Sequence, residues 1–480
     1  MSDRNDALDQ AHTDPYDAAR TGVQAPRRVL ILGAAGRDFH VFNMLYRDDP
    51  AVRVVGFTAA QIPHIDDRRY PAALAGALYP EGIAIHPQSE LDAVVRGEAV
   101  DEVVFAYSDV SQLEVMTLAE QCLALGCQFT LPGPARTMLA ARVPVVAVSA
   151  VRTGCGKSPL SRWLGHELRT RGRRIAVIRH PMPYGDLVRQ RVQRFASAAD
   201  LDAAQCTAEE LEEYEAHLAA GNLVFAGVDY AQVLQAAQRE ADMIIWDGGN
   251  NDFPFVRPDL HLVMVDAWRP EHARGWHPGE AVLRCADVII VSKTDTAVPA
   301  DIQRAAELAR SVNPSAELLY GRSQISADHP ELLHGRRVLA IEDGPTLTHG
   351  GMSIGAAALA VRAAGGELVD PRPHAPTRLA RVLAQYPNLG PVLPALGYSA
   401  DDLDDIEATI AATPCDVIAV GTPIDLARLF RISRPVVRVH YEFSEAQTGA
   451  LGSHLDALLR RFPFARQDQT CASSSNPAVE

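Results

Sequence analysis

The feature that most constrains the fold is an apolar run that leads into a glycine-rich turn, a lysine and a serine. Val145 to Val148 is the run, and Thr153-Gly-Cys-Gly-Lys157-Ser158 follows before a helical segment from Arg162 to Thr170. A strand, a glycine loop and a helix N-terminus in this order present successive backbone N–H groups to phosphate oxygens. The order predicts a P-loop in a domain with a parallel sheet.

Each residue of this loop has an expected role. Lys157 reaches the β- and γ-phosphates of a nucleoside triphosphate, and the Ser158 hydroxyl ligates Mg²⁺. The nucleotide-binding residues predicted in the loop are Thr153, Gly154, Cys155, Gly156, Lys157 and Ser158. Val151 replaces the usual first glycine, and Arg152 stands where a large P-loop subclass has a second lysine. Whether Arg152 acts within its own chain or across a dimer stays open.

A second element ends another apolar strand, Met243 to Trp246. Asp247 follows it, where P-loop enzymes place the carboxylate that holds Mg²⁺. Gly248 and Gly249 allow the backbone to approach the γ-phosphate closely. The polar residues after them are candidates for substrate binding, with an ordinary polar turn as the alternative: Asn250, Asn251 and Asp252.

A third element, Ser292-Lys293-Thr294-Asp295, follows the apolar run Val288 to Val291. It resembles the motif by which GTPases bind guanine, so Lys293 and Asp295 are predicted to contact the base. A capped helix start is the alternative. The element leaves ATP and GTP open.

Two further loops carry candidate residues. Arg179 and His180 follow the strand Ile175 to Ile178 and are expected near the γ-phosphate. Thr348 and His349 lie in a glycine-rich segment that either contacts phosphate or caps the next helix.

Before the P-loop, the alternation of strands and helices from Val29 onward indicates a Rossmann-like domain. It lacks the GxGxxG turn and the acid of a dinucleotide site, so NAD binding is not expected. Its polar residues at the carboxyl ends of strands would suit a small anion. These predicted acceptor-binding residues are Arg37, Asp38, His40, His64, Arg68 and Arg69.

The resulting fold class is α/β, with a Rossmann-like domain, a P-loop NTPase domain and a C-terminal α/β region. The expected boundaries are 1–26 for a disordered leader, 27–140, 141–345 and 346–465 for the three units, and 466–480 for a disordered tail. The net charge of −15 argues against nucleic-acid binding. No apolar run approaches the roughly 20 residues of a membrane span, and seven cysteines without a secretion signal favour the cytoplasm.

Several long stretches resemble the cyclic 2,3-diphosphoglycerate synthetases and their bacterial homologues, often labelled predicted GTPases. The stretches are GAAGRDFHVFN (33–43), IPHIDDRRYP (62–71), LAGALYPEGI (74–83), AVRTGCGKS (150–158), RHPMPYGDL (179–187), IIWDGGNNDFPF (244–255), SKTDTA (292–297) and EDGPTLTHGGM (342–352). The resemblance covers roughly residues 27 to 450.

The resemblance implies that ATP and 2,3-diphosphoglycerate give the cyclic pyrophosphate, ADP and phosphate, with Mg²⁺ and in a homodimer. On that reading the acceptor is a small phosphorylated compound. The catalytic groups would be Lys157, Arg152, Asp247, Arg179 and His180. The alternative is a GTPase or a nucleotide-switched, metallochaperone-like binding protein.

Overall fold

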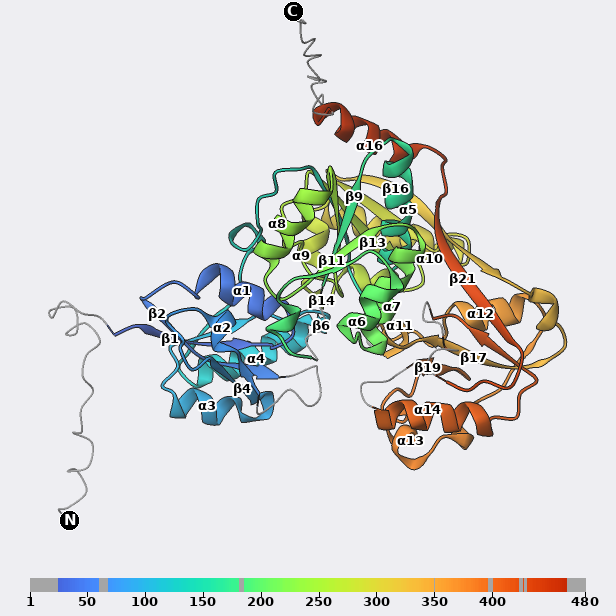
Figure 1. Cartoon of the computed structure of the whole chain (residues 1–480), viewed down its shortest axis with the longest axis horizontal. Helices are drawn as coiled ribbons and strands as arrows, with labels where there is room; N and C mark the ends of the chain where they lie inside the picture. Colours follow the sequence, from blue (N-terminus) through green and yellow to red (C-terminus); the bar gives the residue numbers. More distant parts are fainter. Residues whose placement is uncertain are drawn as a thin grey trace, which may run out of the picture.

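The computed structural model describes residues 25–59, 68–180, 185–348, 350–395, 400–422, 426 and 430–463. The chain forms two main sheets, one in an N-terminal domain and one that runs through the rest of the molecule. Figure 1 shows the N-terminal domain in blue and most of the C-terminal region in orange and red on opposite sides of a green and yellow central domain. The predicted α/β class with parallel sheets is confirmed.

The first domain is a six-stranded sheet with helices that pack on it. In the order β3-β4-β2-β1-β5-β7, its strands are β3 (Arg69–Tyr70), β4 (Ile83–Pro87), β2 (Val52–Ala59), β1 (Arg27–Leu32), β5 (Glu102–Phe105) and β7 (Gln128–Thr130). Its helices are α1 (Arg37–Leu45), α2 (Ala72–Ala75), α3 (Leu91–Gly97) and α4 (Gln112–Ala124). The strands from β4 to β7 are parallel, and β1 lies at the point where the strand order reverses. Open parallel sheets bind ligands beside such a point, at the carboxyl ends of their strands.

The central domain holds the P-loop. Its strands, in sheet order, are β10 (Gln193–Phe195), β11 (Leu223–Ala226), β9 (Ile175–Arg179), β12 (Met243–Asp247), β8 (Val145–Ala150), β13 (Leu260–Asp266), β15 (Val288–Ser292) and β16 (Glu317–Ala327). Its helices are α5 (Lys157–Thr170), α6 (Ala198–Ala204), α7 (Ala208–Ala219), α8 (Tyr230–Glu240), α9 (Gly279–Arg284) and α10 (Pro299–Val312). A short antiparallel two-stranded sheet of β6 (Val110–Ser111) and β14 (Trp276–His277) ties this domain to the first.

The C-terminal region continues the central sheet. Its strands are β21 (Val436–Glu445), β20 (Val417–Val420), β17 (Arg337–Asp343), β18 (Glu367–Leu368) and β19 (Leu393–Ala395). Its helices are α11 (Gly344–Thr348), α12 (Ala356–Ala363), α13 (Thr377–Leu383), α14 (Ala400–Ala412) and α16 (Ala450–Arg461). The antiparallel pair β16–β21 joins the two parts. β17, which precedes the boundary expected at 345, pairs with β18, β19 and β20, which follow that boundary.

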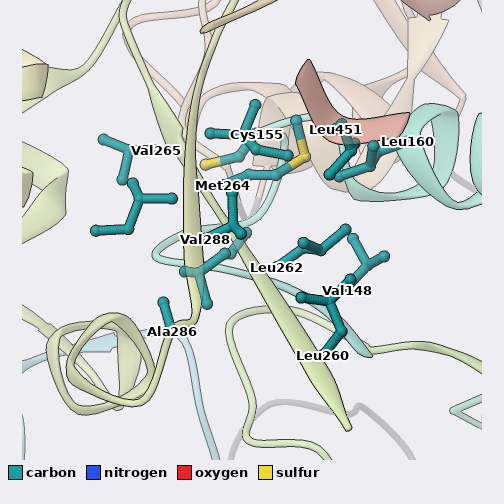
Figure 2. Packing of buried hydrophobic residues seen from close by; sticks show 14 of the residues in the cluster. Val148, Cys155, Leu160, Leu260, Leu262, Met264, Val265, Ala286, Val288 and Leu451 are labelled. Carbon is teal, nitrogen blue, oxygen red and sulfur yellow. The ribbon is translucent and has the colours of Figure 1, made fainter. Parts of the chain in front are cut away.

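A buried apolar cluster anchors the P-loop to the central sheet. Figure 2 shows Cys155 beside Met264, with Leu160 and Leu451 close by. Cys155, Leu160 and Leu451 are each at most 1% exposed. Burying a leucine side chain stabilises a fold by about 1.5–3 kcal/mol. This packing therefore holds the start of α5 against the apolar core. Leu451 belongs to α16, which Figure 1 shows beside α5.

Within the ranges given above, no helix is long and apolar enough to cross a membrane. Most of the expected leader and all of the expected tail lie outside the described residues. The same holds for His64, His349 and the stretch 181–184.

Candidate functional site

The P-loop has the backbone geometry of a phosphate cradle. Gly154 and Gly156 have φ angles of +80° and +99°, in the left-handed region that only glycine enters at little cost. Gly156 is the N-cap of α5, so Lys157 and Ser158 open the helix. The turn and the helix N-terminus therefore direct backbone N–H groups towards a common point.

Lys157 and Lys293 approach this loop from two sides. Lys157 is buried and its ammonium donates to the Asn250 carbonyl, and burial lowers its pKa. Lys293 donates to the Gly154 carbonyl at 2.7 Å and to Asp266 Oδ2 at 2.8 Å. These are the only two lysines among the 45 Lys and Arg residues of the chain. The chain thus places its two compact ammonium groups at the phosphate cradle, and its other Lys or Arg positions are all arginine.

Asp247 ends β12, the neighbour of the P-loop strand β8. Its Oδ2 accepts from Arg179 at 2.7 Å and from His217 Nε2 at 2.9 Å. Burial alone would raise the pKa of Asp247, but Arg179, His217 and Lys157 outweigh it and hold that pKa well below its usual range. Asp247 is therefore an anion.

The second oxygen of Asp247, Oδ1, is buried and has no hydrogen-bond partner among the described residues. A buried carboxylate oxygen without a protein partner fits a Mg²⁺ ion or its water. Ser158, at the first turn of α5, supplies the hydroxyl expected for the same ion. In the described part of the chain no cluster of three or more His, Cys, Asp or Glu residues could hold a metal without other ligands. The donor set therefore suits an ion held largely by phosphate and water.

One cleft of about 280 Å³ joins the first domain, the P-loop domain and the C-terminal region. It brings together most of the predicted site. The predicted residues that line it are Arg37, Asp38, Thr153, Gly154, Gly156, Lys157, Ser158, Arg179, His180, Gly248, Gly249, Asn250, Asp252 and Lys293.

The first-domain wall of the cleft consists of ion-paired side chains. Arg37 NH1 lies 3.2 Å from Asp252 Oδ1, and both side chains are less than 10% exposed. Asp109, from the loop after β5, pairs with Arg152. Asp38 accepts backbone N–H bonds from Ala35 and Gly36, and burial raises its pKa to about 6.

The opposite wall comes from the C-terminal region. Glu342, at the end of β17, accepts from the backbone N–H groups of Gly355, Ala357 and Ala358, and so caps α12. Burial raises the pKa of Glu342 to about 7. Asp343 accepts from the Thr346 hydroxyl at 2.5 Å. The same segment covers the P-loop, because a Cβ on Gly154 would lie 3.3 Å from Thr346 Cγ2.

Two residues predicted to bind the acceptor lie at the contact between the first domain and the P-loop domain. His40 Nε2 lies 2.7 Å from the Thr137 carbonyl, and its ring stacks on Phe255 at 4.4 Å. Burial lowers the pKa of His40 to about 4, so it is neutral at physiological pH. Asn251 is fully buried, donates to the Val151 carbonyl at 3.0 Å and accepts from the Asp109 N–H at 2.9 Å.

Three predicted nucleotide or catalytic residues also lie elsewhere. Arg152 sits behind the cleft wall, with its guanidinium 3.3 Å from the Trp276 ring centroid of the same chain. The Cys155 side chain is in the core, so only its backbone can face a phosphate. Asp295 is exposed and accepts from the Ser323 N–H at 2.9 Å, outside the cleft lining. This geometry does not favour a contact of Asp295 with a base, and that contact stays a prediction.

The predicted anion site at residues 62–71 is not part of the cleft where the structure describes it. Arg68 and Arg69 are exposed, and Arg69 donates to the carbonyls of Glu81 and Gly82 at the edge of the sheet. Thr348 donates to the Gly344 carbonyl within α11 and so supports that helix.

Sequence reasoning missed several residues of the lining. They are Ser108, Asp109, Arg162, Glu212, Glu213, Trp268, Glu342, Asp343, Thr346 and Tyr441. For Ser108 and Asp109 a signal existed, because they follow the apolar run that forms β5, where ligands bind parallel sheets. For Glu212 and Tyr441 we find no comparable signal, since they reach the cleft from a helix face and from a half-exposed strand.

Two comparisons with known proteins, by family profile and by solved structure, find no match or only weak similarity. No protein-family profile matches the chain. Among solved structures it is similar to LpxK from Aquifex aeolicus in complex with ATP, at 13% identity and a TM-score of 0.42, over 77% of this chain and 99% of that one. It is also similar to the hydrogenase maturation factor HypB from Archaeoglobus fulgidus, at 15% identity and a TM-score of 0.26, over 37% and 80%. Both similarities are too low to indicate a function.

A curated relative is far more similar. The chain is 51% identical over 420 residues to arginine synthetase ArcE of Thermococcus kodakarensis, which covers 87% of this chain and 94% of the relative. This relative carries a different product name from the cyclic 2,3-diphosphoglycerate synthetases that the motifs resemble. Identity of this extent leaves no doubt about kinship, and the chain belongs to the family of the arginine synthetase ArcE.

Proposed function

We propose that this protein is an ATP-dependent synthetase that forms arginine. The observation that carries the proposal is the 51% identity to a protein named arginine synthetase, over 94% of that protein's length. The P-loop, with Lys157 and Ser158 at the start of α5, supports it, because a synthetase needs a site where the γ-phosphoryl group can be transferred.

The product identifies the acceptor by its chemistry. Arginine differs from citrulline in one nitrogen that replaces the ureido oxygen, so that oxygen must be made into a leaving group. In our proposal the ureido oxygen attacks the γ-phosphorus of ATP, the bond to the bridging oxygen breaks, and ADP leaves with the electron pair. Ammonia then attacks the ureido carbon, the C–O bond breaks, and phosphate leaves. Citrulline, ammonium and ATP thus give arginine, ADP, phosphate and one proton.

The residues of the cradle have defined tasks in this scheme. Lys157 and the N–H groups of the turn between Thr153 and Ser158 hold the triphosphate and stabilise the charge that builds on the transferred group. Ser158 and Asp247 are the residues that would hold Mg²⁺, which neutralises phosphate charge when bound. Arg179 fixes Asp247 through its 2.7 Å ion pair.

We infer that the nucleotide is ATP rather than GTP. Asp295, the residue that would accept from the guanine N1 and N2 groups, is exposed and bound to the Ser323 backbone. Trp268 lines the cleft beside Lys293, with the ammonium 5.7 Å from the ring centroid, and offers an aromatic face to a purine.

The charge of the cleft favours a neutral acceptor. Among the described residues that line it, seven are Asp or Glu and five are Lys or Arg. Of those arginines, Arg37 and Arg179 are already paired with carboxylates. A neutral ureido group that becomes a cationic guanidinium is compatible with such a lining.

The synthesis of cyclic 2,3-diphosphoglycerate, implied by the motif resemblance, is the second candidate. The position of Arg37, Arg162 and Arg179 in the lining favours it, since guanidinium groups suit phosphate oxygens. The pairing of Arg37 and Arg179 and the seven carboxylates weigh against it, because this acceptor brings several negative charges of its own.

The proposal is tested with purified protein, Mg²⁺, ATP, ammonium and citrulline labelled with ¹⁸O at the ureido oxygen. We expect arginine and ADP in equal amounts and one ¹⁸O atom in the released phosphate. Parallel reactions replace citrulline by 2,3-diphosphoglycerate, or ATP by GTP, and a reaction without acceptor measures idle hydrolysis.

Three outcomes would count against the scheme. Absence of arginine contradicts the proposed function. Arginine with unlabelled phosphate keeps the product but contradicts phosphorylation of the ureido oxygen. A cyclic pyrophosphate product detected by ³¹P resonance would favour the second candidate.

A further inference from the structure

Two carboxylates of the first-domain wall lie together although they come from different domains. Asp109 follows β5 of the first domain, and Asp252 follows β12 of the P-loop domain. The Ser108 hydroxyl is hydrogen-bonded to Asp252, and the Asp109 N–H donates to the side chain of Asn251 at 2.9 Å. Both residues line the cleft, together with Gly248 and Gly249.

Asp109 is held in an uncommon conformation. Its φ angle is +65°, in the left-handed region that few residues other than glycine occupy. Its N–H also donates to the His277 carbonyl at 2.9 Å, and Arg152 donates to its carbonyl at 3.3 Å. Strain of this kind is kept where the surroundings fix it, and it is frequent at ligand-binding sites.

Asp109 lines the cleft, and its carboxylate is ion-paired through one oxygen alone. Arg152 pairs with the carboxylate from behind and is itself stacked on Trp276, outside the lining. The Asp109 side chain is 3% exposed, and Oδ2 has no hydrogen-bond partner in the part of the chain that the structure describes. A buried carboxylate oxygen in this state is expected to have a ligand partner.

Asp109 and Asp252 also lie next to the position of the reacting phosphate. Asp109 is among the charges that act on the Lys157 ammonium, which reaches the β- and γ-phosphates in a P-loop. Arg37 holds Asp252 at 3.2 Å, as Arg152 holds Asp109. The wall therefore presents two oriented carboxylates beside the site of phosphoryl transfer.

We propose that Asp109 and Asp252 form the pocket for the reacting end of the acceptor, a ureido group that becomes a guanidinium. This inference rests on the proposed function. Positive charge develops on the ureido carbon and its nitrogens as phosphate leaves, and carboxylates fixed in advance stabilise that charge without reorganising. The pocket should therefore bind the cationic product guanidinium more strongly than the neutral ureido group.

The test compares Asp109→Asn and Asp252→Asn with the control Asp404→Asn, an exposed residue of α14. Asparagine tolerates the left-handed backbone, so Asp109→Asn keeps the local fold, and thermal unfolding verifies this. We expect kcat/KM for citrulline to fall roughly 100-fold in Asp109→Asn while KM for ATP changes less than threefold. Calorimetric titration in the presence of ADP should show a larger loss of affinity for arginine than for citrulline.

Each outcome bears on a different statement. A wild-type protein that makes no arginine contradicts the proposed function and this pocket with it. An active wild type whose two variants keep their arginine affinity and kcat/KM within twofold overturns the pocket alone. Equal losses of affinity for arginine and citrulline also overturn it, because a merely structural role would not discriminate by charge. If Asp252→Asn does not fold, Asp109→Asn alone decides.

Discussion

On the first-domain wall of the cleft, Asp109 is paired with Arg152 and Asp252 with Arg37. On the C-terminal wall, Glu342 and Asp343 bind groups of their own segment, namely the N-terminus of α12 and the Thr346 hydroxyl. The two walls carry the same kind of side chain in the same cleft. Their different partners indicate that the first wall is organised for a ligand and the second for its own loop over the P-loop.

Two buried groups, His40 at the contact between the first domain and the P-loop domain and Glu342 on the C-terminal wall, respond to pH in opposite directions. Burial lowers the pKa of His40, which packs the first domain on the P-loop domain, to about 4, and it raises the pKa of Glu342 to about 7. The first contact is therefore weakened by acid, because the unfolded histidine takes up a proton that the folded one excludes. The second is weakened as the pH rises, since the buried glutamate must then ionise.

The largest effect should come from Lys157, which lines the cleft between the two walls. We expect Lys157→Ala to lower kcat roughly 100- to 1,000-fold, because the γ-phosphate loses its main positive charge. Rates of arginine formation with the control Arg310→Ala, an exposed residue of α10, provide the reference. Activity of Lys157→Ala near that of the control would contradict the role of Lys157 at the γ-phosphate.

The next largest effect concerns His40, at the contact between the first domain and the P-loop domain, and the loss of stability in acid. Since His40 has a pKa of about 4 when folded and about 6.5 when unfolded, its contribution is complete above pH 6.5 and is lost as the pH falls towards 4. Between pH 8 and pH 5 this amounts to about 2 kcal/mol of unfolding free energy. Chemical denaturation of His40→Phe at the two pH values should show a pH dependence smaller by that amount.

The exposed His329→Phe serves as the control for this measurement. An unchanged pH dependence in His40→Phe would show that the contact between the first domain and the P-loop domain is not where acid acts.

The smallest effect should come from the C-terminal wall. Thr346→Val removes the hydroxyl that Asp343 binds, so the segment over Gly154 loses a hydrogen bond worth about 1 kcal/mol. We expect KM for ATP to rise roughly fivefold with kcat/KM for citrulline at saturating ATP unchanged. Steady-state kinetics with each substrate varied in turn measure both. A larger effect on citrulline than on ATP would reverse the roles assigned to the two walls.

The parts of the site that the sequence predicts well consist of residues that are neighbours in the chain. The glycine loop, Lys157 and Ser158 are adjacent in the chain, and the order of strand, turn and helix is a local signal. Such patterns need no knowledge of distant partners.

The parts that sequence missed depend on distant pairing. Strand β16 alternates between exposed and half-buried residues along most of its length, so it lacks the apolar run that reveals a buried strand. Its pairing with β21 joins the C-terminal region to the P-loop sheet and brings Tyr441 to the cleft. The contact of Asp295 with the Ser323 backbone depends on the same strand, β16, which the sequence pattern does not reveal.

The most direct test is a crystal structure of the protein with a nonhydrolysable ATP analogue, Mg²⁺ and citrulline. We expect the β- and γ-phosphates on the turn between Thr153 and Ser158, with Lys157 within hydrogen-bond distance, and the ureido group between the γ-phosphate and Asp109. Citrulline bound against Glu342 and Asp343, or phosphates away from this turn, would contradict the account.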